Sequence, residues 1–213
     1  MRAITIGFLA LTMTGAGFAS HRHHSKQAGG QAGAFDFYVL VLSWSPEFCY
    51  SHPDAGECGE HHGFLVHGLW PQNSDGTFPL NCHTDQPGPT NPEAMSDIMP
   101  HEIVRHEWLA HGTCSGLNGD QYFALIRRLF GSIRIPDRLK QPDRSTTLSV
   151  IDMKHSFEQA NPQLRDNEIV VQLRGNYLNG VEFCESKQET PAPVSCSGLR
   201  DTRQGTFVVP PVR

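Results

Sequence analysis

A run of nine residues near the middle of the chain, HEWLAHGTC (His106–Cys114), holds side chains suited to proton transfer. If the run is helical, Glu107 and His111 are four residues apart and therefore project from one face. His106 lies roughly 100° to one side of Glu107, because an α-helix has about 3.6 residues per turn. A carboxylate and a histidine directed at one point, with a second histidine beside them, suit acid–base chemistry next to an anion.

The same run must be distinguished from a zinc metalloprotease motif. The H-E-x-x-H motif of those enzymes places two histidines four residues apart so that both can bind one metal ion. His106 and His111 are five residues apart, which separates them by about 140° around a helix axis. The spacing therefore argues against a hydrolytic zinc site on this helix.

A second run, VHGLWPQ (Val66–Gln72), combines a histidine with a flat aromatic side chain. His67 stands beside a glycine on an expected strand, and Trp70 follows three residues later. An indole ring can stack on a nucleobase. Taken alone, His67 is more simply interpreted as a structural histidine, so this run acquires a catalytic meaning only in combination with the first one.

The charge balance limits the partners that the chain can bind. Lys and Arg number 17 against 22 Asp and Glu, which gives a formal net charge of −5. This argues against a protein that holds nucleic acid on a broad basic surface, although an enzyme can still contact a few phosphates. Protonation of all 12 histidines would change −5 to +7, so anionic partners are favoured in mildly acidic surroundings.

The N-terminus has the composition of a secretory signal peptide over residues 1–19. Arg2 is the one early charge, an apolar stretch covers residues 4–13, and small residues lead to Ala19, after which we expect cleavage. The apolar stretch is shorter than the about 20 residues needed to span a bilayer. We therefore expect a secreted or periplasmic protein without a membrane anchor.

The rest of the chain is expected to consist of a leader and one folded domain. Residues 20–34 are polar and Gly-rich, which predicts a flexible segment. Residues 35–213 have the length and the apolar content of a single domain. An alternative for the leader is a metal-binding function, because it contains His21, His23 and His24.

Six cysteines in an exported chain predict three disulfides, for which the sequence alone allows 15 pairings. Short intervening loops favour Cys49–Cys58 and Cys184–Cys196, which leaves Cys82–Cys114. A zinc site is a weak alternative, because no C-x-x-C pair occurs in the chain.

The elements that must position these residues are a mixture of strands and helices. Buried strands are predicted over residues 35–44, ended by Pro46, and over residues 63–70. Later segments predict helices over 103–111, 121–129 and from Ser149 to before Pro162, a turn-rich stretch over 73–92, and strands over 169–173 and 177–184. The elements do not alternate strictly, so the predicted fold class is α+β.

Together the two runs resemble the two active-site segments of the ribonuclease T2 family. Members of this family are secreted endoribonucleases that act at acid to neutral pH. The segment LSWSPEFC (Leu42–Cys49) precedes the first run, as in that family, and HGTCSGLNGDQYF (His111–Phe123) continues the second. The resemblance extends over Phe35–Cys196. It implies a single α+β domain with a central, mainly antiparallel sheet flanked by helices.

The resemblance also implies a reaction. Members of this family cleave single-stranded RNA without a metal or another cofactor: the 2′-hydroxyl attacks the adjacent phosphorus and gives a 2′,3′-cyclic phosphate, which hydrolysis can convert to a 3′-phosphate. His111 would be the general base and His67 the general acid. His106 and Glu107 would lie against the phosphate. We expect a monomer as the default.

Base binding is implied for Trp70 and Phe78, which would hold the base between them. Gln72 stands where an acidic residue often reads the base edge in the family, so we expect low base specificity. The chain departs from the family at Ala110, because a lysine commonly precedes the second catalytic histidine. Loss of one charge-stabilising contact can reduce a rate by about 10² to 10³, so the alternative is a weak or inactive secreted relative that binds RNA or protein.

Overall fold

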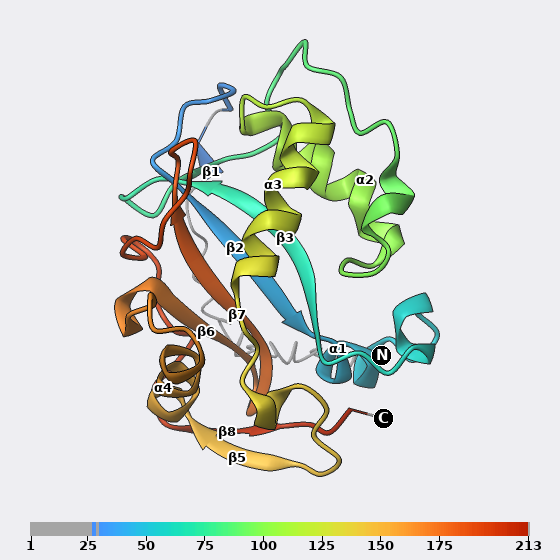
Figure 1. Ribbon diagram of the computed structural model, residues 1–213, viewed down its shortest axis with the longest axis vertical. Coiled ribbons are helices and arrows are strands. Elements are labelled where there is room, and N and C mark those ends of the chain that lie inside the picture. Colours follow the sequence, from blue (N-terminus) through green and yellow to red (C-terminus); the bar gives the residue numbers. More distant parts are fainter. Residues whose placement is uncertain (1–26, 29, 213) are drawn as a thin grey trace, which may run out of the picture.

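The computed structural model describes residues 27–28 and 30–212, in which a six-stranded sheet organises the chain (Figure 1). The strand order is β3-β2-β7-β8-β5, and β6 also pairs with β7. All pairs are antiparallel except β7 and β8, which meet in a single parallel pair. The strands are β2 (Phe37–Trp44), β3 (Phe64–Gln72), β5 (Thr146–Ser149), β6 (Ile169–Arg174), β7 (Tyr177–Ser186) and β8 (Thr206–Val209).

The central strand β2 is apolar almost throughout because both of its faces are covered. Leu40, Leu42 and Trp44 point into the larger core, which the helices complete. Val39 and Val41 point to the opposite face, where a smaller cluster contains the cysteines of the C-terminal part. Alternating side chains of a strand thus enter two separate cores, and this explains why the sequence of β2 shows no polar–apolar alternation.

Four α-helices occur in the described residues. Figure 1 shows α3 crossing in front of β2 and β3, where its apolar stripe packs on the sheet. The helices are α1 (Ser45–Ser51), α2 (His101–Ala110), α3 (Gly119–Ser132) and α4 (Val150–Ala160). Short 3-10 turns cover Gly56–Gly59, Pro92–Met95, Gly112–Cys114, Asp137–Leu139 and Asp166–Glu168. This arrangement confirms the α+β class and the mainly antiparallel sheet.

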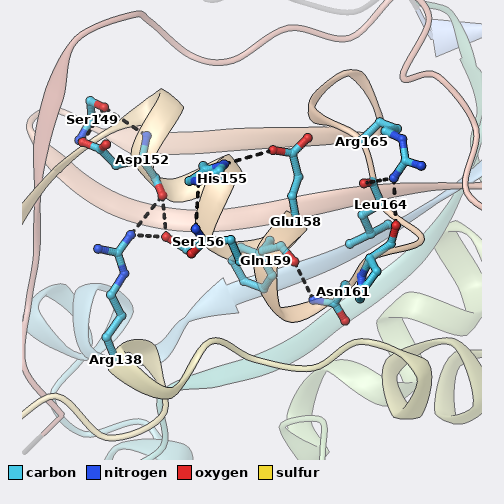
Figure 2. A network of polar contacts seen from close by, with 12 residues as sticks. Arg138, Ser149, Asp152, His155, Ser156, Glu158, Gln159, Asn161, Leu164 and Arg165 are labelled. Atoms are coloured by element: carbon cyan, nitrogen blue, oxygen red, sulfur yellow. Dashed lines mark hydrogen bonds and ion pairs between the residues drawn. The ribbon is translucent and has the colours of Figure 1, made fainter.

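Helix α4 begins at a reciprocal cap. The Asp152 backbone N–H donates to Ser149 Oγ (3.0 Å), and the Ser149 N–H donates to Asp152 Oδ2 (3.2 Å). Each bond gives a partner to a backbone N–H that has no acceptor within the helix. Figure 2 shows Arg138 reaching the same turn, where its guanidinium donates to the Asp152 carbonyl oxygen (2.9 Å) and to Ser156 Oγ.

The expected strands and helices are present, with ends shifted by a few residues. Five further elements were not expected, namely α1, β1 (Gln27–Ala28), β4 (Phe78–Pro79), β5 and β8. Pro46 lies in the first turn of α1, where a missing N–H has no cost, and so it begins a helix as well as ending the strand. The strands β5 and β8 have four residues each, which is too short for a clear alternation pattern.

The three disulfides agree with the pairs favoured by the short loops. The sulfur atoms are bonded in Cys49–Cys58, Cys82–Cys114 and Cys184–Cys196, and no cysteine among the described residues is free. Cys82–Cys114 is the long-range link, with a sequence separation of 32 residues. It joins the loop after β3 to the end of the α2 region, and both segments carry predicted site residues.

The end of the expected leader is attached to the domain. Strand β1 (Gln27–Ala28) pairs in parallel with β4 (Phe78–Pro79), and the Gly33 N–H donates to the Cys114 carbonyl oxygen (2.8 Å). This attachment was not expected, because the segment has no apolar periodicity. The expected signal peptide and the leader histidines lie outside the described residues. Within the described part, no helix is long and apolar enough to cross a membrane.

Candidate active site

His67 occupies an irregular position in β3. Val41 of β2 faces Gly68 and the next residue, Leu42, faces Val66, so His67 is an extra residue between two registered pairs. Such a bulge redirects a side chain and bends the strand. The imidazole Nδ1 lies 3.2 Å from Ser43 Oγ, and 40% of the side chain is exposed. The bulge therefore places one half-exposed histidine at the surface of an otherwise buried strand.

Glu107 lies opposite His67 on helix α2 and is fully buried, with 0% of its side chain exposed. Its Oε2 accepts a hydrogen bond from the indole Nε1 of Trp70 (2.9 Å). Its Oε1 lies 3.4 Å from His67 Nε2 and has no hydrogen-bond partner among the described residues. A buried carboxylate requires compensating contacts, and here two side chains of β3 supply them.

Gly68 makes the close approach of α2 to β3 possible. A Cβ atom at this position would lie 1.9 Å from Glu107 Oε2 and 2.8 Å from Trp70 Nε1. Both distances are far below a van der Waals contact. Every other residue type would therefore separate Glu107 from Trp70 or push α2 away from the strand.

His111 sits at the C-terminal cap of α2, where its N–H donates to the Glu107 carbonyl oxygen (3.0 Å). Its ring stacks on Trp70 with centroids 5.0 Å apart and an angle of 22° between the planes. Only 9% of the residue is exposed. Burial lowers the pKa of His111 to about 4, the charge of Glu107 opposes this, and charges on His67 and His106 add to the lowering.

The neutral state of His111 has a chemical consequence. A neutral imidazole has one nitrogen that can accept a proton. The buried Nδ1 atom of His111 has no hydrogen-bond partner within residues 30–212. Above a pH of about 4 the ring is therefore a proton acceptor held in place by Trp70.

The other predicted site residues have different surroundings. His106 is exposed on α2, whereas Ala110 is buried on the same helix. Phe78 is half-buried on β4, and Gln72 is buried at the end of β3, where its Nε2 has no hydrogen-bond partner in the described chain. The structure thus brings His67, Glu107, Trp70 and His111 into contact. Within the described residues, no side-chain hydrogen bond, ion pair or ring contact joins Phe78 or Gln72 to this group.

Two supporting residues were missed by the sequence analysis. Ser43 contacts His67, and the buried Tyr122 hydroxyl donates to the Leu69 carbonyl oxygen (2.7 Å), which fixes β3 beside the site. Ser43 is the one small polar side chain in a strand of aliphatic and aromatic residues, and this departure was the available signal. Tyr122 gave no such signal, because a tyrosine at helical spacing is normally a core residue.

No cluster of three or more potential metal ligands occurs in the described residues.

Comparison with known proteins identifies the family to which this chain belongs. The model of the ribonuclease T2 family matches residues 35–196. A ribonuclease of Aeromonas hydrophila is 34% identical over 184 residues, which cover 84% of this chain and 84% of the relative. Ribonuclease I of Escherichia coli (strain K12) is 26% identical over 220 residues, which cover 79% of this chain and 82% of that protein.

Solved structures show the same fold. Ribonuclease MC1 from bitter gourd seeds superposes with a TM-score of 0.61 at 26% identity, over 81% of this chain and 99% of the other. An RNase-related protein from Calystegia sepium gives a TM-score of 0.67 at 21% identity, over 84% and 98% of the two chains. The chain therefore belongs to the ribonuclease T2 family and is a T2-type endoribonuclease.

The close packing at Gly68 gives a testable prediction. Gly68→Ala should leave the core intact but displace Glu107 from Trp70, and a displacement of about 1 Å at a reacting group can reduce a rate by about 10²-fold. The measurement is the rate of RNA cleavage together with unfolding in urea.

Gly131→Ala is the matched control for this substitution. Gly131 lies in α3 with no atom within 4 Å of an added Cβ. This variant should keep its activity and gain up to ~1 kcal/mol of stability. A folded Gly68→Ala variant with the activity of the parent would show that the packing is not required.

Proposed function

We propose that this chain cleaves single-stranded RNA by transesterification, with His111 as the general base and His67 as the general acid. The observation that carries the proposal is the contrast between the two rings. His111 is buried and neutral against Trp70, whereas His67 is half-exposed beside the Glu107 carboxylate. His111 is thus suited to the role of the base, and we assign the role of the acid to His67 beside the carboxylate.

The first step forms one bond and breaks another. His111 removes the proton of the ribose 2′-hydroxyl, and the 2′-oxygen attacks the adjacent phosphorus. The bond from phosphorus to the 5′-oxygen breaks, and His67 gives its proton to that leaving oxygen. The products are a 2′,3′-cyclic phosphate and a free 5′-hydroxyl. Water can then open the cyclic ester to a 3′-phosphate, with the two histidines in exchanged roles.

Glu107 supports the acid rather than the phosphate in this scheme. A protonated His67 has the carboxylate as a counter-charge 3.4 Å from its Nε2. The other carboxylate oxygen is occupied by the Trp70 N–H. Glu107 is fully buried, whereas 40% of the His67 side chain is exposed, so solvent screens the pair from the His67 side only.

His106 is the cation proposed to face the phosphate. Ala110 carries no charge, so the site lacks the lysine that the family commonly has next to the catalytic histidine. His106 is exposed on the same helix, and in its protonated form it can stabilise the pentacoordinate phosphorane. An imidazole carries a charge only when it is protonated, whereas a lysine is charged at neutral pH. A site that uses His106 in place of a lysine therefore favours activity in mildly acidic solution.

The base is proposed to stack on the face of Trp70 that His111 leaves free. One face of the indole already contacts His111, and its N–H is bound to Glu107. Phe78 would close the other side of the base, and Gln72 would offer an amide in place of a carboxylate. An amide both donates and accepts hydrogen bonds, and this supports low base specificity.

The proposed location and partners follow from the same features. Three disulfides form readily only in an oxidising compartment, and this supports an exported enzyme that acts in the periplasm or outside the cell. The proposed substrate is single-stranded RNA, without a metal ion. The proposed state in solution is a monomer.

The first prediction concerns the two histidines. Homopolymeric RNAs incubated with the parent in EDTA should yield 2′,3′-cyclic phosphates, and His67→Ala and His111→Ala should each lose about 10²- to 10⁴-fold in rate. The products can be resolved by mass spectrometry. Absence of cleavage at any pH by a folded and oxidised protein would contradict the proposal and favour an RNA-binding protein without catalysis.

A second prediction follows from the buried base. The pKa of His111 is lowered to about 4 by burial, so kcat/KM should stay high down to about pH 5 and fall near pH 4, where the base becomes protonated. The unfolded chain binds this proton at its ordinary pKa of about 6.5, so stability should decrease as the pH falls from 6.5 to 4, by on the order of 3 kcal/mol.

His111→Gln tests this second prediction. The variant should lack most of that pH dependence in urea unfolding experiments between pH 4 and 7. An acid limb of kcat/KM centred near pH 6.5 in the parent would contradict a buried, neutral base.

The third prediction concerns the missing lysine. His106→Gln should lower kcat by about 10²-fold in acidic solution with a smaller effect on KM, because the lost charge acts on the transition state. The loss should shrink at alkaline pH, where an imidazole carries no charge. Arg105→Gln, which removes the neighbouring exposed cation, should leave kcat unchanged. Equal effects of the two substitutions would indicate a general charge effect instead.

A further inference from the structure

A cavity of about 540 Å³ opens beside α1, apart from the four residues that form the candidate active site. Its lining comes from α1, the loop closed by Cys49–Cys58, the start of β7 and the C-terminal prolines Pro210 and Pro211. Figure 1 shows that α1 and the C-terminal end of the chain lie at the same end of the molecule. The proposed mechanism uses none of the residues that line this cavity.

Glu47 lines the cavity with an incompletely compensated carboxylate. The residue is only 6% exposed, and its Oε2 has no hydrogen-bond partner in the described part of the chain. Its Oε1 lies 3.7 Å from Arg174 Nε, while another nitrogen of that guanidinium donates to Ser51 Oγ (3.0 Å). Burial raises the pKa of Glu47, and the Arg174 charge offsets this only in part. Oε2 is thus a buried carboxylate oxygen in the wall of the cavity without a hydrogen bond from the described residues.

Glu57 brings a second carboxylate to the same cavity. Its Oε1 accepts a hydrogen bond from Ser45 Oγ (3.0 Å), and burial raises its pKa, to which the charge of Glu102 adds. Among the described residues that line the cavity there is no lysine or arginine. The histidines in the lining are His61 and His62, and His62 Nε2 is paired with Glu60 (2.8 Å). The lining thus contributes two carboxylates, of which Glu47 also faces the Arg174 guanidinium from outside the lining.

Aromatic and proline side chains form the rest of the wall. Tyr50 is 91% exposed and Tyr177 is 50% exposed, although both are large apolar groups. Pro46 and Pro210 add apolar surface. An alkyl chain can pack on such surface, and a cation can lie over a tyrosine ring.

We infer that this cavity is a binding site for an organic cation, an ammonium or guanidinium group carried on an apolar stem. The cationic end would lie against the wall that Glu47 and Glu57 form, and the stem would lie between Tyr50 and Tyr177. The two carboxylates disfavour a phosphodiester chain in this cavity. Two kinds of molecule carry such a cation. One is a free polyamine, and the other is a partner protein with a lysine or arginine side chain. This inference does not depend on the catalytic proposal.

The test is a calorimetric titration of the full, oxidised chain with 1,5-diaminopentane at neutral pH. Saturable binding should weaken at least about tenfold in Glu47→Gln, because the amide keeps the shape but loses the charge. Tyr50→Ala, at a side chain that the fold does not bury, should weaken it as well. Glu189→Gln removes an exposed carboxylate that does not line the cavity, and it should leave the affinity unchanged.

Further arms of the experiment identify the source. Binding of Nα-acetyl-lysine methylamide, lost on acetylation of Nζ, would support a protein side chain, whereas binding of the diamine alone would support a free polyamine. Absence of saturable binding of either probe would overturn the inference. Unchanged affinity in both Glu47→Gln and Tyr50→Ala would do the same. Displacement of the diamine by a short RNA would also overturn it, because the cavity would then belong to the RNA-binding surface.

Discussion

The buried carboxylate of Glu107 determines how the candidate site is built. A charge with no exposure to water is tolerated only where close partners replace the solvent. Here the Trp70 N–H and the His67 ring replace it, and both belong to one strand. Helix α2 must therefore lie close against β3, and Gly68 is the residue whose missing side chain allows that distance.

The same contact gives two histidines different properties. His67 stands on the exposed side of the carboxylate, at a bulge that moves it out of the regular strand. His111 stands at the end of the helix that carries Glu107, behind the indole ring, where burial keeps it neutral. The surroundings of His111 thus lower its pKa, whereas His67 remains half-exposed beside the carboxylate.

Much of this arrangement could be predicted from the sequence. The apolar runs of β2 and β3 indicated buried strands, and the spacing of Glu107 and His111 placed both side chains on one face of a helix. The bulge at His67 could not be predicted, because it depends on the register between β2 and β3. Burial of His111 was equally hidden, since it results from the contact with a ring 41 residues away in the sequence. His111 also proved to be the C-terminal cap of α2, which ends one residue before the predicted helix end.

The position of β7 in the sheet has a consequence for biosynthesis. The residues of the candidate site all precede Cys114, but β2 lies between β3 and β7, and β7 ends at Ser186. A growing chain therefore contains both histidines long before it contains the strand that completes their support. An RNA-cleaving enzyme is made on a ribosome, in direct contact with the RNA that it could destroy. Because β2 pairs with β7 as well as with β3, the sheet beside the site is complete only after most of the chain has been synthesised.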